Sequence, residues 1–111
     1  MEITTKELKR VQLISPNGRI DHEAARELER ALMALIEAGY YRFVIDMSEV
    51  KYISSAGLRV LLALRKAARR WNRGDVCLAA LHPLVRDTIE LVGFDKVFEV
   101  YDTVVEAVGS Y

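Results

Sequence analysis

Two adjacent serines, Ser54 and Ser55, stand directly before an apolar helical segment, within the stretch YISSAGLRVLLALRKAARRWNRG (residues 52–74). A helix N-terminus presents unpaired backbone N–H groups and the positive end of the helix dipole. A serine side chain at this position can cap the helix, which stabilises it by about 1 kcal/mol. The same position also suits a phosphorylated hydroxyl, because the N–H groups and the dipole favour a phosphate.

Gly57 follows the serine pair in the expected first turn of the helix. A glycine there costs about 1 kcal/mol relative to alanine. A glycine retained at this cost indicates that a partner or a neighbouring backbone approaches Gly57 closely, or that the helix packs tightly against Asp46.

The serine pair is expected at the edge of a sheet where ligands bind. The continuous apolar run Tyr41–Met47 predicts a strand buried on both faces, as in parallel sheets. Eight residues, MSEVKYIS, connect this strand to the next helix, whereas most such connections have about two to six. Three strands end in polar or special residues, at Ser15–Gly18, Asp46–Ser48 and His82. The carboxyl ends of parallel strands meet at one edge, so we expect these segments and the serines to be neighbours.

The whole chain, residues 1–111, is predicted to be one α/β domain. Strands alternate with helices, which implies right-handed crossovers and a mostly parallel (mixed) sheet of roughly four to five strands with about four helices. The expected strands are Leu8–Ser15, ended by a turn at Ser15–Gly18, then Tyr41–Met47, Asp75–Leu81 and Lys96–Tyr101, with residues 1–5 as an additional edge strand. The expected helices run from the cap Asp21 to Gly39, from Ala56 to about Arg73, from Pro83 to Val92, and from a cap at Asp102 or Thr103 with Glu106 in a capping box.

Composition excludes several kinds of partner. Hydrophobic residues make up 51% of the 111 residues and charged residues 29%, which is typical of a globular domain. Lys and Arg balance Asp and Glu at 16 each, which argues against nucleic acid or an anionic membrane as a partner. The sequence has no apolar run near the roughly 20 residues of a membrane span and no signal-peptide core at its start. Together with a single cysteine, Cys77, expected to be a buried reduced thiol, this predicts a cytoplasmic protein.

Catalysis is not expected. A hydrolase would use Ser55 as nucleophile with His82 and either Asp75 or Asp87, but Ile53 stands where the nucleophile elbow needs its first glycine. The six glycines form neither a dinucleotide-binding nor a phosphate-loop motif. We therefore predict that the chain is not an enzyme.

The remaining conspicuous residues are interpreted as structural. His22 and His82 have no partners at metal-ligand spacing, so we expect no metal and no cofactor. The basic run between Arg65 and Arg73 is interpreted as a solvated face near a helix C-terminus. Trp71 continues the apolar stripe of its helix and is predicted to lie in the core.

The segments FVIDMSEVKYISSAGLRVLLALRKAAR and GFDKVFEVYDTVVEAV resemble the STAS domain, the fold of bacterial anti-sigma-factor antagonists. The stretch NGRIDHEAARELERAL is similar to the Gly-x-x-Asp entry into that family's first helix. The resemblance extends from about Val11 to Val108. Its most specific part is the Asp-x-Ser strand end followed by the Ser-Ala-Gly-Leu helix start.

The resemblance implies a function in transcription regulation. Family members typically carry a Ser or Thr at the head of the second helix, which a partner kinase, often the anti-sigma factor itself, phosphorylates. Unphosphorylated members bind the anti-sigma factor and free the sigma factor, and phosphorylated members are released. The matching position is Ser55, or less favourably Ser54, and the implied partners are an anti-sigma factor or serine-protein kinase and a phosphatase.

One departure from the family pattern keeps an alternative open. Many members have Asp where this chain has Ser54. The alternative is a STAS scaffold subunit of a larger sensory or lipid-transport assembly that is never phosphorylated.

The implied partner surface comprises the loop Met47–Ser55, the first turn of the second helix, and the segment Asn17–Asp21. The residues expected to bind the partner, around the phosphorylation site Ser55, are Asn17, Gly18, Asp21, Asp46, Ser48, Ser54, Gly57, Leu58 and Arg59.

Overall fold

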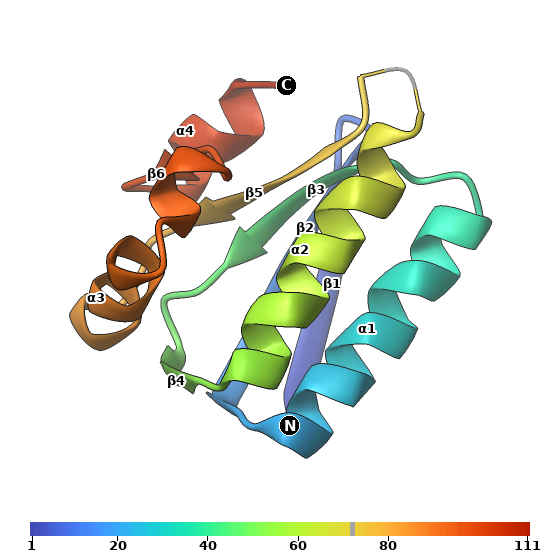
Figure 1. Ribbon diagram of the computed structural model, residues 1–111. Coiled ribbons are helices and arrows are strands. Elements are labelled where there is room, and N and C mark those ends of the chain that lie inside the picture. The colour runs from blue at the N-terminus through green and yellow to red at the C-terminus, as the bar shows by residue number, and fades with distance from the viewer. Residues whose placement is uncertain (72) are drawn as a thin grey trace.

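Six strands and four α-helices are found in residues 1–71 and 73–111, the part of the chain that the computed structural model describes (Figure 1). In chain order they are β1 (Glu2–Leu8), β2 (Val11–Ile20), α1 (His22–Glu37), β3 (Arg42–Asp46), β4 (Val50–Ile53), α2 (Ser55–Arg69), β5 (Asp75–Ala79), α3 (Pro83–Leu91), the 3-10 turn η1 (Phe94–Lys96), β6 (Val100–Tyr101) and α4 (Val104–Gly109).

The strands form one mixed sheet in the order β1-β2-β3-β5-β6, with β4 paired to β2 beyond the end of β3. The β1–β2 pair is antiparallel and every other pair is parallel. Helices α1 and α2 lie side by side across one face of the sheet, and α4 packs on the other face (Figure 1). This confirms the predicted α/β class with a mostly parallel sheet.

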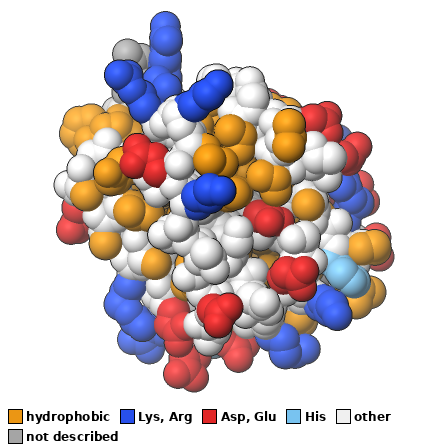
Figure 2. All heavy atoms as spheres, turned by 180° about the vertical axis from the view of Figure 1, so that it is seen from behind, with side chains coloured by type: hydrophobic (Ala, Val, Ile, Leu, Met, Phe, Trp, Pro, Cys, Tyr) orange, Lys and Arg blue, Asp and Glu red, His pale blue; other side chains and the backbone are white. Residues whose placement is uncertain are grey.

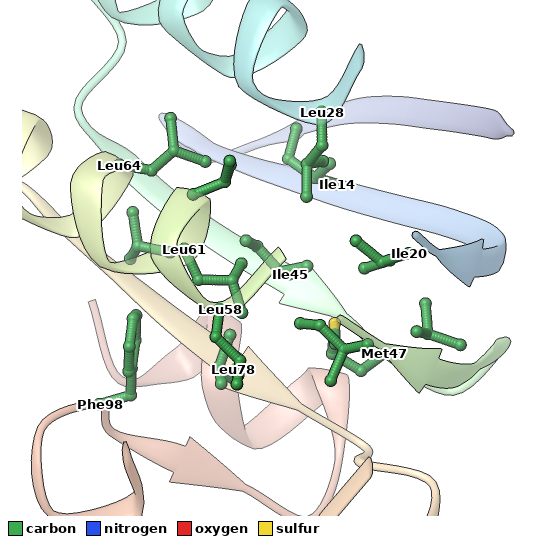
Figure 3. Packing of buried hydrophobic residues seen from close by; sticks show 14 of the residues in the cluster. Ile14, Ile20, Leu28, Ile45, Met47, Leu58, Leu61, Leu64, Leu78 and Phe98 are labelled. Carbon is green, nitrogen blue, oxygen red and sulfur yellow. The ribbon is translucent and has the colours of Figure 1, made fainter. Parts of the chain in front are cut away.

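The main core lies between the sheet and the helices α1 and α2. Leu58 and Leu61 of α2 lie beside the sheet residues Ile45 and Leu78, and Leu64 belongs to the same cluster (Figure 3). A second cluster on the opposite face is made of Val11, Val44, Cys77, Ala79 and Ala107. Successive strand residues point to opposite faces, so a strand covered on both sides must be apolar throughout, which explains the continuous hydrophobic run of β3.

The predicted turn at Ser15–Gly18 is wrong. Strand β2 continues to Ile20, and the chain reverses instead at Lys9 and Arg10, which have φ angles of 52° and 71°. The β2–β3 ladder ends before Ser15 and the β2–β4 ladder begins at Gly18, so Pro16 lies where β2 has no neighbour on that side. Gly18, with φ of 122°, supports a bulge there rather than a turn.

Two predicted elements differ in extent. The second helix ends at Arg69 rather than near Arg73, and Asn72 lies outside the described residues. Gly74 still has a structural role, because a Cβ at this position would collide with the carbonyl oxygen of Ala68. In the predicted strand Lys96–Tyr101 only the last two residues pair with β5.

Trp71 does not lie in the core as predicted. Half of its surface is exposed, and its ring stacks on Tyr41 with the ring centroids 4.7 Å apart. The helix ends before Trp71, so the apolar stripe of α2 no longer sets the direction of this side chain.

The predicted helix starts are confirmed by their caps. The Asp21 carboxylate accepts a hydrogen bond from the backbone N–H of Ala24 at 2.9 Å. Thr103 accepts from the backbone N–H of Glu106 at 3.2 Å, while its hydroxyl donates to the Glu106 carboxylate at 2.9 Å. Pro83 occupies the first turn of α3, with His82 as its N-cap.

Gly57 sets how closely the first turn of α2 approaches the sheet. A Cβ at this position would lie 2.7 Å from Cγ1 of Ile53 and 2.8 Å from Cγ2 of Ile20, closer than carbon atoms pack. The tight contact is therefore with the ends of β2 and β4 rather than with Asp46. It holds the start of α2 against these two strand ends.

We predict that Gly57→Ala lowers the free energy of unfolding by about 1–3 kcal/mol, because the added methyl must displace two packed isoleucines. Urea unfolding measures this change. The matched control is Gly109→Ala in α4, where a Cβ meets no atom within 4 Å, so the variant should be neutral or more stable. Equal effects of the two substitutions would contradict the packing argument.

Candidate functional site

Three chain segments are joined at one edge of the sheet by backbone hydrogen bonds. The N–H of Gly18, near the end of β2, donates to the carbonyl of Glu49 in the β3–β4 loop at 3.1 Å. The N–H of Ser54, just before α2, donates to the carbonyl of Ile20 at 2.8 Å. The N–H of Met47 donates to the carbonyl of Ala79 at the end of β5 at 2.9 Å. The structure thus brings together the end of β2, the β3–β4 loop and the serine pair, which the sequence predicted to be neighbours, and the end of β5 joins them at Ala79 rather than at His82.

The two serines have different environments. Ser54 is the N-cap of α2, and its hydroxyl oxygen accepts a hydrogen bond from the N–H of Gly57 at 3.1 Å. Ser54 is half-buried, whereas Ser55 is the first residue of the helix and is exposed. The capping role therefore belongs to Ser54, and the hydroxyl of Ser55 is open to solvent at the positive end of the helix.

The carboxylates of the site shape its loops. Asp46, at the end of β3, accepts a hydrogen bond from the N–H of Ser48 at 3.0 Å and so fixes the start of the β3–β4 loop. Asp21 caps α1, which is the role that the sequence predicted. Any contact of Asp46 or Asp21 with a partner would come in addition to these structural roles.

Some of the remaining residues of the predicted partner surface are exposed and others are buried. Asn17, Ser48 and Arg59 are exposed, and Gly18 is half-buried. Gly57 and Leu58 are buried and belong to the packing beneath the surface. They hold the first turn of α2 in place.

One exposed pair at this edge was not identified from the sequence. The guanidinium carbon of Arg19 lies 4.2 Å from the ring centroid of Tyr52, in a cation–π arrangement. Only the pairing of β2 with β4 places these residues opposite each other. Strand β4 lies inside a segment that the sequence indicated only as an unusually long connection, so no signal pointed to the pair.

Asp75 is not placed to complete a hydrolase triad with Ser55, and His82 has a capping role. Asp75 pairs with Arg69 in the last turn of α2 at 3.1 Å. Ser55 begins the same helix, about 20 Å away at 1.5 Å per residue. His82 accepts a hydrogen bond from the N–H of Leu84 through Nδ1 at 3.2 Å, as the cap of α3. Among residues 1–71 and 73–111, no group of three or more His, Cys, Asp or Glu side chains is arranged to hold a metal ion.

The basic run is divided between ion pairs and solvent. Arg65 and Arg69 both lie against Asp75, with Nε of Arg65 3.5 Å from its carboxylate, and so tie the end of α2 to the start of β5. Arg70 and Arg73 are exposed. Figure 2 shows positive and negative side chains interspersed over the face of the molecule behind α1 and α2, in line with the zero net charge.

Cys77 and Tyr111 are the titratable groups with shifted pKa values. Burial raises the pKa of the Cys77 thiol to about 11. Burial also raises the pKa of Tyr111, whose hydroxyl lies 2.8 Å from the carbonyl oxygen of Phe43 and 2.9 Å from that of Asp75. Both groups are protonated at neutral pH, and Cys77 is the buried thiol that the sequence predicted.

The geometry of the serine edge agrees with the family comparison, in which residues 2–107 match the model of the STAS domain. The chain belongs to the STAS domain family. This confirms the resemblance to the STAS domain that the sequence indicated, over nearly the full length of the chain. Anti-sigma-factor antagonists of this family are regulatory proteins rather than enzymes, in agreement with the prediction from the sequence.

Two sequence relatives cover most of the chain. BtrV, a candidate anti-sigma factor antagonist of Bordetella bronchiseptica, is 35% identical over 90% of this chain and 85% of its own. RsfB, an anti-sigma-F factor antagonist of Mycobacterium tuberculosis, is 30% identical over 95% of this chain and 84% of its own.

Solved structures share the STAS fold. An anti-sigma factor antagonist from Mycobacterium paratuberculosis superposes with a TM-score of 0.85 at 29% identity, covering 98% of this chain and 92% of its own. The antagonist SpoIIAA has the same fold in its unphosphorylated form, with a TM-score of 0.83 at 18% identity over 96% of this chain and 93% of its own. SpoIIAA of Bacillus in its phosphorylated form gives 0.76 at 17% identity over 98% of both chains.

None of the helices within the described residues combines the length and the apolar character that crossing a membrane requires.

We predict that Ser54→Ala lowers the free energy of unfolding by about 1 kcal/mol, because the N–H of Gly57 loses its cap. Ser55→Ala should change it by less than about 0.5 kcal/mol, because the exposed first position of a helix accepts alanine. Urea unfolding of the two variants checks this contrast. Equal destabilisation would show that both hydroxyls support the helix.

Proposed function

We propose that the protein is an anti-sigma-factor antagonist that switches partners through Ser55. With Ser55 unmodified, it binds an anti-sigma factor that is also a serine kinase. With Ser55 phosphorylated, it is released. The observation that carries the proposal is the exposed hydroxyl of Ser55 at the first residue of α2, beside a separate capping serine.

The partner surface proposed here is the docking edge, defined as residues 17–21, residues 47–55 and the exposed Arg59 of α2. Backbone hydrogen bonds join its segments, so it can present one fixed shape to the partner. RsfB, an anti-sigma-F factor antagonist, and BtrV, a candidate anti-sigma factor antagonist, resemble this chain over most of its length and support this kind of partner.

Charge is the physical basis of the proposed release. Phosphorylation adds about 1.5 to 2 negative charges to Ser55 at neutral pH. At a surface that a partner has covered, a new charge must be desolvated and meets any acidic group opposite it. The backbone need not move, because Ser55 is already exposed at the first residue of α2. A phosphatase restores binding by removing the charge.

The serine at position 54 is compatible with this mechanism. Asp and Ser are both strong N-caps, so replacing the family's usual Asp by Ser keeps the cap that Ser54 provides. What changes is one negative charge beside Ser55. The same replacement is the feature that favours the second candidate function, a STAS scaffold that is never phosphorylated.

We predict that Ser55→Asp weakens binding of the anti-sigma factor from the same genome about tenfold or more, because a permanent charge enters the docking edge. Ser55→Ala should bind as tightly as the wild type. Isothermal titration calorimetry measures both affinities.

The matched control for this test is Ser110→Asp, which adds the same charge at the C-cap of α4 and should leave the affinity unchanged. If Ser55→Asp binds as tightly as the wild type, the switch is contradicted and the scaffold function is favoured.

A further inference from the structure

A groove between α1 and α2 opens beside Ser55. The two helices run side by side with their N-termini at the same end of the molecule (Figure 1). The groove has a volume of about 300 Å³ and is lined by His22, Ala25, Arg26 and Glu29 of α1 and by Ala56, Arg59, Val60 and Ala63 of α2. Its end near the docking edge therefore carries an imidazole and two guanidinium groups.

The two arginines of this groove have no carboxylate partner in the described part of the chain. No carboxylate oxygen among the described residues lies within 4 Å of a side-chain nitrogen of Arg26 or Arg59. By contrast, Arg65 and Arg69 of the same helix α2 are paired with Asp75. Arg26 of α1 and Arg59 near the start of α2 are thus available for an anion, while Arg65 and Arg69 at the end of α2 are already paired.

Arg59 lies where it can reach Ser55. Residues four apart on a helix share a face, with Cβ atoms about 5–6 Å apart. Helical side chains lean toward the N-terminus, so the long side chain of Arg59 extends toward the turn that begins with Ser55. With about 3.6 residues per turn, Arg59 is displaced from Ser55 toward the side of α2 on which Ala56 and Val60 line the groove.

We propose that Arg59 is the internal receptor for a phosphate on Ser55, with Arg26 contributing from across the groove. This inference rests on the proposed function, in which Ser55 is the phosphorylated residue. A guanidinium can donate two parallel hydrogen bonds to a phosphate, a geometry that an ammonium group cannot match. The first turn of α2 presents its N–H groups to the same anion.

Two carboxylates of the start of α1 and of the groove, those of Asp21 and Glu29, lie elsewhere or are engaged, whereas Glu23 lies near His22 and Arg26. The Asp21 carboxylate, at the start of α1, is engaged with the N–H of Ala24. Glu29 lines the groove about 10 Å further along α1 than His22, at 1.5 Å per residue.

Pairing of Arg59 with a phosphate on Ser55 would weaken partner binding in two ways. Arg59 is exposed on the docking edge and can contact an acidic partner group when Ser55 is unmodified. Once Ser55 is phosphorylated, the phosphate adds its own charge and also withdraws Arg59 from the partner. The release then depends on Arg59 as well as on Ser55.

The test uses protein with phosphoserine incorporated at position 55 by genetic encoding, so that neither a kinase nor a partner is needed. Phosphorus NMR follows the second pKa of the phosphate, which is about 6 in free phosphoserine. A nearby guanidinium favours the dianion and lowers this pKa, so we expect Arg59→Gln to raise it by about 0.5 pH unit or more relative to the unsubstituted phosphoprotein. Arg59→Lys, which keeps the charge without the planar fork, should fall between the two.

The matched control is Arg70→Gln, which removes the same charge from the C-cap of the same helix, about 20 Å from Ser55. It should leave the phosphate pKa unchanged. The proposal is overturned if Arg59→Gln leaves the pKa where the unsubstituted phosphoprotein has it, or shifts it no more than Arg70→Gln does. Since no partner enters this measurement, its failure is distinct from a failure of Ser55→Asp to weaken partner binding.

Discussion

The contact of Gly57 with Ile20 and Ile53 is the constraint on which the rest of the site depends. Because no Cβ fits between α2 and the ends of β2 and β4, the first turn of the helix lies directly on the sheet. This contact fixes where the helix begins, and Ser54 completes the start by capping the N–H of Gly57. The next residue, Ser55, is left outside the packed layer with its hydroxyl in solvent.

Strand β2 extends this constraint to the other segments of the docking edge. It pairs with β1 from Val11 to Asn17, with β3 in its first half and with β4 in its last residues. The end of β2 therefore holds the β3–β4 loop and the start of α2 by hydrogen bonds from Gly18 and to Ile20. A surface built in this way can change its charge without changing its shape, which is what the proposed switch requires.

Local signals in the sequence predicted the parts of the fold that short-range chemistry decides. The caps Asp21 and Thr103, the proline at the start of α3 and the apolar run of β3 all lead to elements that the structure contains. The serine edge was predictable from the length of the connection before α2, although β4 within it was not. The exposure of Ser55 could not be derived from the sequence, because it depends on which of two adjacent serines caps the helix.

The predictions from the sequence were wrong where pairing between distant segments outweighs the conformational preference of the local residues. Lys9 and Arg10 form the hairpin turn with positive φ angles, although neither residue favours that region, because β1 and β2 pair on either side of them. The Ser15–Gly18 segment has turn chemistry and is nevertheless strand, because Ser15, Pro16 and Asn17 pair with β1 and Gly18 pairs with β4. Trp71 was placed in the core by helical periodicity, but the helix ends before it. The Arg19–Tyr52 contact likewise required the strand register.

The most direct measurement of the central claim is residue-level mapping of phosphate on the protein after co-expression with serine kinases from its own genome. Fragment-ion mass spectrometry of the intact and digested chain distinguishes Ser54 from Ser55. The account predicts phosphate on Ser55, the exposed hydroxyl, and none on Ser54, whose oxygen is engaged in the cap. Phosphate on Ser54 alone, or an unmodified chain with every such kinase, would contradict it.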